Sequence, residues 1–249
     1  MEHTDDILSI AVSGDNHGAQ LVATGEIGKS PTINVFDAKT MQTVVSLKGF
    51  HRRGVNQLAF SKDGDMLLSV GLDDDHSIAV YSTKDGKLIA STKGNKSKVL
   101  CAVGSSFKNG LFCTAGVKHV ETWMVTAGSI KKSKVPWGKG GIQNGLCAAF
   151  TNEKTLVVGA AKGEIFVFHN SAFKSKVAAH DGSVNCLEIH PGGKIITGGK
   201  DGKVHLWESN LRGKMTVDMS AFAKAEVRVC ESDLRKDTCT ANTPTTFLT

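Results

Sequence analysis

The chain has 249 residues, of which 40% are hydrophobic, and a formal net charge of +6 at pH 7. This length suffices for one large domain with a real core. No apolar run approaches the roughly 20 residues that span a bilayer. The first residues, MEHTDDILSI, are acidic where secretory or mitochondrial leaders are basic, so we expect a soluble, unprocessed chain.

Five units of similar internal order follow one another along the chain. Each begins with a turn, continues through an apolar strand, crosses a turn rich in glycine or aspartate, and ends on a strand with an aromatic residue. Apolar runs of four to six residues broken by turns indicate strands rather than helices. The units span residues 3–37, 51–82, 94–124, 140–169 and 180–208.

The closing aromatic residues define the period of the repeat. They are separated by 45, 42, 45 and 39 residues, which matches the period of about 40–45 expected when each repeat supplies one four-stranded propeller blade. We therefore predict an all-β WD-repeat β-propeller, which is a binding scaffold rather than an enzyme. The aromatic residues are Phe36, Tyr81, Trp123, Phe168 and Trp207.

Unit five carries a complete set of polar residues at WD-repeat positions. We predict that His180 links Asp201 in the turn to the Thr197 hydroxyl and the Trp207 indole N–H. Such a buried network stabilises a blade only if every member finds a partner. Unit two retains His51 and Ser69 of this set. We interpret these histidines as structural, the alternative being that they are ligands or catalytic groups.

Charge is distributed unevenly. Residues 1–83 carry a net charge of −5, whereas residues 84–139 hold 11 lysines and two acids, a net charge of +9. A concentrated basic region can steer the protein towards an acidic partner such as tubulin tails, nucleic acid or anionic lipid. The alternative is a solvated lysine-rich face.

Within this basic region, residues 129–141 (SIKKSKVPWGKGG) are predicted to form a loop between blades, where propellers usually bind partners. We expect its lysines to attract acidic tubulin tails while Trp137 supplies a desolvated anchor. The alternative is a solvated loop with Trp137 packed against a blade. The lysines are Lys131, Lys132, Lys134 and Lys139.

No pattern in the chain predicts a catalytic residue, a metal site or a cofactor. The GKGG run at 138–141 lacks the spacing of a phosphate loop, and the Asp73–Asp75 turn lacks the spacing of an EF-hand. The six cysteines form no CxxC pair, and we expect free thiols. Aromatic residues are not interleaved with basic ones, so neither nucleic acid nor a membrane is an expected partner.

The last part of the chain departs from the repeat. Residues 209–233 are predicted to begin a partial sixth blade, and residues 234–249, which are polar and rich in threonine, to form an irregular or disordered tail. Five blades and part of a sixth leave the propeller incomplete or closed by another segment. It closes as a small propeller, is covered by a partner, or continues in a longer chain.

Several stretches resemble the echinoderm microtubule-associated protein-like family: residues 3–12, 40–81, 131–150 and 177–208. The resemblance covers residues 3–208 and implies the first propeller of the family's tandem atypical propeller module. It implies a non-enzymatic scaffold that binds tubulin or microtubules, alongside other cytoskeletal or axonemal proteins. The implied location is the cytoplasm and cytoskeleton, including the ciliary axoneme. The alternative is a general adaptor that recruits a peptide or protein without binding microtubules.

Overall fold

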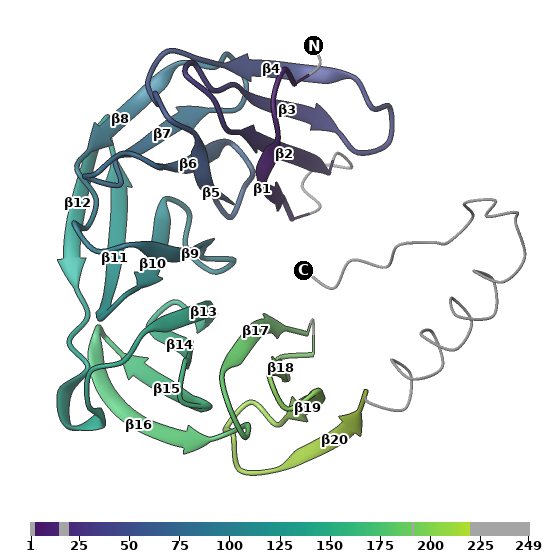
Figure 1. Ribbon diagram of the computed structural model, residues 1–249, viewed down its shortest axis with the longest axis vertical. Coiled ribbons are helices and arrows are strands. Elements are labelled where there is room, and N and C mark those ends of the chain that lie inside the picture. The colour runs from purple at the N-terminus through teal and green to yellow at the C-terminus, as the bar shows by residue number, and fades with distance from the viewer. Residues whose placement is uncertain (1–2, 15–19, 191, 220–249) are drawn as a thin grey trace, which may run out of the picture.

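The computed structural model describes residues 3–14, 20–190 and 192–219, and these form five four-stranded sheets arranged in an arc (Figure 1). Within each sheet the strands follow chain order and pair antiparallel, so each sheet is one blade built by consecutive hairpins. The first strand of each blade lies at the inner side of the arc and the fourth at the outer rim. The predicted all-β propeller architecture is confirmed.

The strand bounds are as follows. Blade 1 contains β1 (Ile7–Val12), β2 (Leu21–Glu26), β3 (Ile33–Asp37) and β4 (Thr43–Leu47). Blade 2 contains β5 (Val55–Phe60), β6 (Met66–Gly71), β7 (Ile78–Ser82) and β8 (Leu88–Thr92). Blade 3 contains β9 (Val99–Gly104), β10 (Leu111–Gly116), β11 (His119–Thr126) and β12 (Ser129–Lys134). Blade 4 contains β13 (Gly145–Asn152), β14 (Thr155–Ala160), β15 (Glu164–His169) and β16 (Ala172–Ala178). Blade 5 contains β17 (Val184–Ile189), β18 (Ile195–Gly199), β19 (Lys203–Trp207) and β20 (Lys214–Asp218).

Each predicted repeat contains the first three strands of one blade, apart from the last two residues of β11, and the fourth strand lies in the segment that follows it. This corrects one predicted boundary. Residues 209–219 do not begin a sixth blade, because β20 pairs with β19 and completes blade 5. Residues 220–233 and the predicted tail at 234–249 lie outside the described residues.

The core lies between the blades rather than inside any one of them. Each of the four junctions holds an apolar cluster made by two neighbouring sheets. All five closing aromatic residues fall on the third strand of their blade, and Trp123 and Phe168 are fully buried. A lone four-stranded sheet has no such core, so each blade depends on its neighbours for burial.

Over the described residues the arc does not close into a ring (Figure 1). Apolar side chains consequently stand exposed at both ends of it. Ile10 and Val12 on blade 1 are 56% and 50% exposed, and Met215 and Val217 on blade 5 are 62% and 46% exposed. No helix among the described residues is long and apolar enough to cross a membrane.

Candidate functional site

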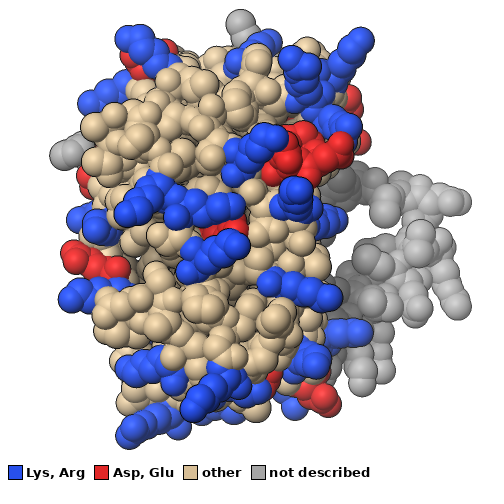
Figure 2. Space-filling view, turned by 90° about the vertical axis from the view of Figure 1, so that its left-hand side faces the viewer, with Lys and Arg blue, Asp and Glu red and all other residues tan. Residues whose placement is uncertain are grey.

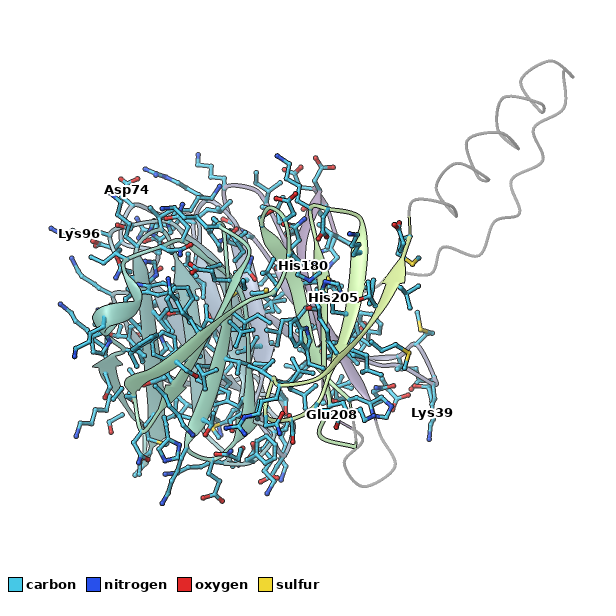
Figure 3. All side chains as sticks on the ribbon, turned by 90° about the horizontal axis from the view of Figure 1, so that it is seen from below. Lys39, Asp74, Lys96, His180, His205 and Glu208 are labelled. Carbon is cyan, nitrogen blue, oxygen red and sulfur yellow. The ribbon has the colours of Figure 1, made fainter. Side chains whose placement is uncertain are left out.

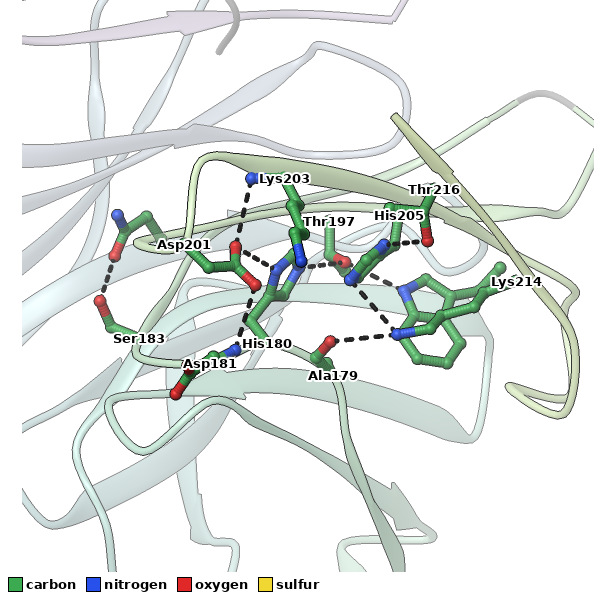
Figure 4. Close-up of polar contacts among 12 residues, drawn as sticks. Ala179, His180, Asp181, Ser183, Thr197, Asp201, Lys203, His205, Lys214 and Thr216 are labelled. Atoms are coloured by element: carbon green, nitrogen blue, oxygen red, sulfur yellow. Dashed lines mark hydrogen bonds and ion pairs between the residues drawn. The ribbon is translucent and has the colours of Figure 1, made fainter. Parts of the chain in front are cut away.

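The predicted polar network of blade 5 is assembled in the structure (Figure 4). The His180 ring donates from Nδ1 to the Asp201 carboxylate at 2.9 Å, and its Nε2 lies 2.9 Å from Thr197 Oγ1. The Trp207 indole N–H donates to the same hydroxyl at 3.0 Å. Because Nδ1 holds the proton of a neutral ring, Thr197 donates to Nε2 while it accepts from Trp207. The network therefore connects β18, β19 and the turn between them to the segment that precedes β17.

A second histidine extends this network towards the outer rim. His205 stacks on His180 with ring centroids 4.4 Å apart, and Lys214 Nζ lies 3.3 Å from its Nε2. Burial, and then the positive charge of Lys214, hold the pKa of His205 below its usual value. Burial alone would raise the pKa of Asp201, but bonds from the Asp181 amide and the His180 ring lower it to about 2. A carboxylate at Asp201 and a neutral ring at His205 are the expected forms at neutral pH.

His180, Asp201 and His205 also present metal-ligating atoms within 4.8 Å of one another. All four ring nitrogens of the two histidines already have partners, which are Asp201, Thr197, Thr216 and Lys214. A cation entering here would have to displace the Lys214 ammonium and break these bonds. The arrangement can connect strands, and we assign it a structural role.

Blade 2 has a shorter version of the network. His51 Nε2 lies 2.7 Å from Ser69 Oγ, and the longer turn brings Ser77 Oγ within 3.5 Å of its Nδ1. Ser77 in turn donates to the Asp73 carboxylate. Burial lowers the pKa of His51 to about 4, despite the nearby charge of Asp73, which raises it. The neutral ring is thus the form that fits the folded chain.

This pKa makes the stability depend on pH. Between the usual value of 6.5 and about 4, the unfolded chain binds a proton on His51 that the folded chain does not. The contribution of the neutral His51 to the free energy of unfolding is fully present above pH 6.5. It decreases as the pH falls towards 4, by about 3 kcal/mol in total at 1.36 kcal/mol per pKa unit. The stability difference between wild type and His51→Gln, measured by urea unfolding, is expected to shrink by that amount from pH 7 to pH 4. A difference independent of pH would contradict this assignment.

Blade 1 holds a related network that the sequence analysis did not identify. His3 contacts Thr24 Oγ1 at 2.6 Å through Nε2 and the Glu26 carboxylate at 2.9 Å through Nδ1. Glu26 is 2% exposed, and although burial raises its pKa, bonds from the Thr4 and Thr32 amides lower it to about 2. Only the leading histidine of the first unit signalled this network, because the acid stands on the strand instead of in the turn.

The first six residues of the 129–141 segment form a strand instead of the predicted loop. Residues Ser129–Lys134 form β12, which pairs along its length with β11 at the outer rim of blade 3. A short 3-10 helix, η1 (Gly138–Gly140), follows before blade 4. The cross-strand partners explain the correction, because β11 offers an open edge along which six residues pair.

The structure separates Lys132 from the other lysines of this segment. Lys132 stands opposite Trp123 in the register, and its Nζ lies 5.2 Å from the indole ring. The same ammonium is 3.4 Å from Glu121, a carboxylate only 2% exposed, which also accepts from Asn95. Lys214 repeats the arrangement over Trp207 in blade 5 at 5.0 Å. Lys132 therefore compensates a buried charge and caps a core indole.

Trp137 lies in the core between blades 3 and 4, with 5% of its surface exposed. Its ring meets Phe166 edge-on at 4.8 Å and Phe168 at 5.8 Å. In blade 4, Val158 stands where blade 5 has Thr197, so the central hydroxyl of the blade 5 network is missing and aromatic rings pack beside this position. Trp137 is therefore not an exposed anchor for a partner. It packs against a blade, as the alternative interpretation stated.

The remaining lysines of the 129–141 segment are exposed to solvent. Lys131, Lys134 and Lys139 are exposed, and no acidic side chain of the described residues forms an ion pair with any of them. Lysine and arginine predominate over acids on this outer side of the arc (Figure 2). Lys96 lies on the same face as Asp74, opposite the face of Lys39 and Glu208 (Figure 3).

We call Lys96, Lys98, Lys118, Lys131, Lys134 and Lys139 the blade 3 lysine surface. A backbone bond from Val117 to Lys98 and one from Lys118 to the Asn144 side chain hold its turns together. Nearby acids are already engaged, Asp74 by Arg53 and Asp75 by Lys93. This leaves a field of uncompensated positive charge on ordered backbone, which suits a flexible acidic partner.

The inner strands of all five blades surround a cavity of about 910 Å³ at the centre of the arc. Its lining is mixed, with apolar groups such as Val12, Phe60 and Leu187 beside polar groups such as Thr151 and Glu188. Concave, mostly preformed sites of this size bind small ligands or peptides in other proteins.

Comparison with known proteins places these features in context. A family model described as the echinoderm microtubule-associated protein first beta-propeller matches residues 1–246. The chain is 27% identical over 224 residues to human echinoderm microtubule-associated protein-like 1, covering 84% of this chain and 27% of that protein. It is 28% identical over 248 residues to echinoderm microtubule-associated protein-like 4 of Xenopus laevis, covering 87% and 26% respectively.

A ciliary WD repeat-containing protein, ctxp80, of Euplotoides octocarinatus is 27% identical over 235 residues, covering 90% of this chain and 32% of that protein. The chain thus spans about a quarter to a third of the length of these relatives. Among solved structures, the β-propeller domain of Cps50 (Swd1) of Myceliophteria thermophila superposes with a TM-score of 0.69 at 14% identity, covering 83% of this chain and 67% of that one. This last likeness concerns the fold alone.

Proposed function

The chain belongs to the family of the echinoderm microtubule-associated protein first β-propeller, and from this premise we propose that it is a non-enzymatic scaffold that associates with microtubules. The observation that carries the proposal is the family match over residues 1–246. The names of its relatives, which include microtubule-associated proteins and a ciliary protein, support a cytoskeletal or ciliary location. The family and fold are of the propeller scaffold type.

The blade 3 lysine surface is the part of the molecule that we assign to tubulin. Tubulin carries acidic tails, and exposed lysines without partners raise the local concentration of such a segment at modest ionic strength. Lys131, Lys134 and Lys139 belong to this function, whereas Lys132 is excluded because it compensates Glu121. Binding through exposed charges weakens as salt is added.

The test is co-sedimentation of the full chain with stabilised microtubules, assembled from intact tubulin or from tubulin without its acidic tails. The triple variant Lys131→Glu, Lys134→Glu, Lys139→Glu is expected to bind intact microtubules about tenfold more weakly, from roughly 0.2–1 kcal/mol for each exposed pair and additional repulsion. Wild type is expected to lose affinity on tail-less microtubules and at high salt, and the triple variant much less.

A matched control reverses the charge of three exposed lysines on the turns at the opposite ends of the strands. Lys84, Lys108 and Lys154 lie there, and none forms an ion pair with an acid of the described residues. Their replacement by glutamate changes the net charge equally and should leave binding near wild type. Equal losses in both triple variants would assign binding to net charge instead of to the blade 3 lysine surface.

A general adaptor is the second candidate function, and the central cavity favours it. In that case the cavity binds a peptide, and the protein does not co-sediment with microtubules at any salt concentration. The same experiment therefore separates the two candidates.

A further inference from the structure

A pocket of about 400 Å³ lies between blades 3 and 4. Blade 4 supplies its apolar wall through Phe150, Leu156 and Phe168, which are buried. Leu111 and Met124 of blade 3 face this wall and are partly exposed. Pockets of this volume with apolar walls commonly bind small groups in other proteins.

Blade 3 presents a polar residue to this pocket where other blades present valine. On the third strands of blades 1, 2 and 4, the residue before the closing aromatic packs on the next blade, as Val35, Val80 and Val167 do. The equivalent residue of β11 is Thr122, which is partly exposed and lines the pocket. Its hydroxyl lies 3.5 Å from the Ser133 carbonyl. A hydroxyl therefore stands at a position that elsewhere belongs to the apolar core, and it is available to a ligand.

Charged side chains stand at the mouth of the pocket. Lys108, in the turn before β10, and Lys154, in the turn before β14, line it from the two blades. Both are exposed, and neither forms an ion pair with an acid of the described residues. Glu153 also lines the mouth, so two positive charges and one negative charge leave a net charge of +1. The pocket thus suits a ligand with one negative charge beside an apolar group.

The size of the pocket limits the distance between these two parts of the ligand. In the last residue of a peptide, the terminal carboxylate and the side chain are attached to the same Cα, so both can enter one pocket. An acidic side chain inside a peptide is carried by a different residue from the apolar one, and neighbouring side chains of an extended chain point to opposite sides. Recognition of a carboxyl terminus is a recurrent mode of peptide binding.

We propose that this pocket binds the carboxyl-terminal residue of a partner protein, with a bulky apolar side chain against Phe168 and the terminal carboxylate at Lys108 and Lys154. The Thr122 hydroxyl offers a hydrogen bond to the backbone of that residue. Lys108 precedes β10 and Lys118 follows it, so the mouth of the pocket and this lysine of the blade 3 lysine surface lie at opposite ends of the strand. The site goes beyond the proposed association with microtubules, because it recruits a second protein to the scaffold.

Fluorescence anisotropy of a labelled peptide tests the pocket in the full chain. The probe is the peptide GSGSGF with fluorescein at its amino terminus and a free carboxyl terminus, and its carboxyl-terminal amide is the control. The free acid should bind about tenfold or more tightly than the amide, because the amide lacks the charge that the lysines stabilise. Replacement of the final phenylalanine of the peptide by glycine should abolish binding, since the apolar wall then has no partner.

Two variants locate the binding site. Thr122→Phe fills the pocket from the blade 3 side and should abolish binding of the free acid. Lys154→Glu reverses one charge at the mouth and should weaken binding about tenfold. The matched control Lys84→Glu makes the same change in the turn between β7 and β8 of blade 2 and should bind as wild type does. Urea unfolding verifies that each variant is folded, and if Thr122→Phe is not, the exposed Lys154 still decides the test.

Equal binding of the free acid and the amide would overturn the proposal, and so would binding that Thr122→Phe and Lys154→Glu leave unchanged. Decanoate offers a carboxylate on an apolar chain without a peptide backbone. If it displaces the peptide at concentrations below the peptide's own Kd, the pocket selects a small amphiphile and the proposal is wrong. Dimers of the chain that Thr122→Phe dissociates, measured by sedimentation velocity, would also overturn it, because a second copy would then occupy the pocket.

The peptide site and the microtubule site can fail separately. The triple variant Lys131→Glu, Lys134→Glu, Lys139→Glu should bind the peptide as wild type does, although its binding to microtubules is expected to weaken. Lys154→Glu should do the reverse. Loss of peptide binding in the triple variant would overturn the assignment to this pocket and place the peptide on the blade 3 lysine surface.

Discussion

Replacement of Trp137 by alanine is expected to lower the free energy of unfolding by about 3–5 kcal/mol, the usual cost of deleting a large buried aromatic side chain. The ring is 5% exposed and packs edge-on against Phe166 and Phe168. It fills the junction of blades 3 and 4, where Val158 replaces the threonine of the blade 5 network, so its loss leaves a cavity beside Phe166 and Phe168. Urea unfolding at pH 7 measures the change.

Two further variants make this result specific. Lys139→Ala, two residues away on the exposed side of the same connection, should alter stability by less than about 0.5 kcal/mol. The indole N–H of Trp137 is buried without a partner in the described residues, so Trp137→Phe removes an unsatisfied donor and should cost less than alanine. A Trp137→Ala variant as stable as wild type but weaker on microtubules would restore the predicted role of this ring as a partner anchor.

Thr197→Val should destabilise blade 5 although valine has nearly the same shape as threonine. The change removes the hydroxyl that accepts from Trp207 and donates to His180. Both buried groups then lack a partner, at about 1–3 kcal/mol for each. Thermal and urea unfolding at neutral pH measure the loss.

The control is Thr126→Val, because Thr126 is exposed at the end of β11 and its substitution should be nearly neutral. Combining Thr197→Val with Trp207→Phe isolates the pair, since the second change removes the donor that the first leaves unsatisfied. The combined loss should be smaller than the sum of the two single losses. Strict additivity would indicate that the indole and the hydroxyl do not act together.

The repeat could be predicted from the sequence because its signals are local. Turn residues, short apolar runs and one aromatic residue per unit recur at a constant spacing, and each is a property of neighbouring residues. The network of blade 5 could be predicted for the same reason. Its members stand at characteristic positions within one unit: His180, Thr197, Asp201 and Trp207. The acid of blade 1 was missed because Glu26 reaches His3 from a strand position that the pattern does not mark.

The 129–141 segment shows where local signals are insufficient. A run of lysines beside a proline and glycines has the composition of a loop, yet residues 129–134 pair with β11 as an outer strand. Alternation alone does not reveal that Lys132 faces a buried glutamate while Lys131 and Lys134 are free of acids. That division depends on Glu121, which precedes Lys132 by eleven residues and lies across the strand pair, and on the Trp123 indole beneath the lysine.

By itself, the sequence determined that this protein consists of WD-type blades and which aromatic residue each repeat contains, because hairpins and their turns are encoded locally. Only the tertiary structure decided which lysines are available to a partner and that Trp137 belongs to the core. These properties arise where one sheet packs on the next. There, the fit between side chains of different blades decides what is buried, and no single repeat contains both sides of the contact.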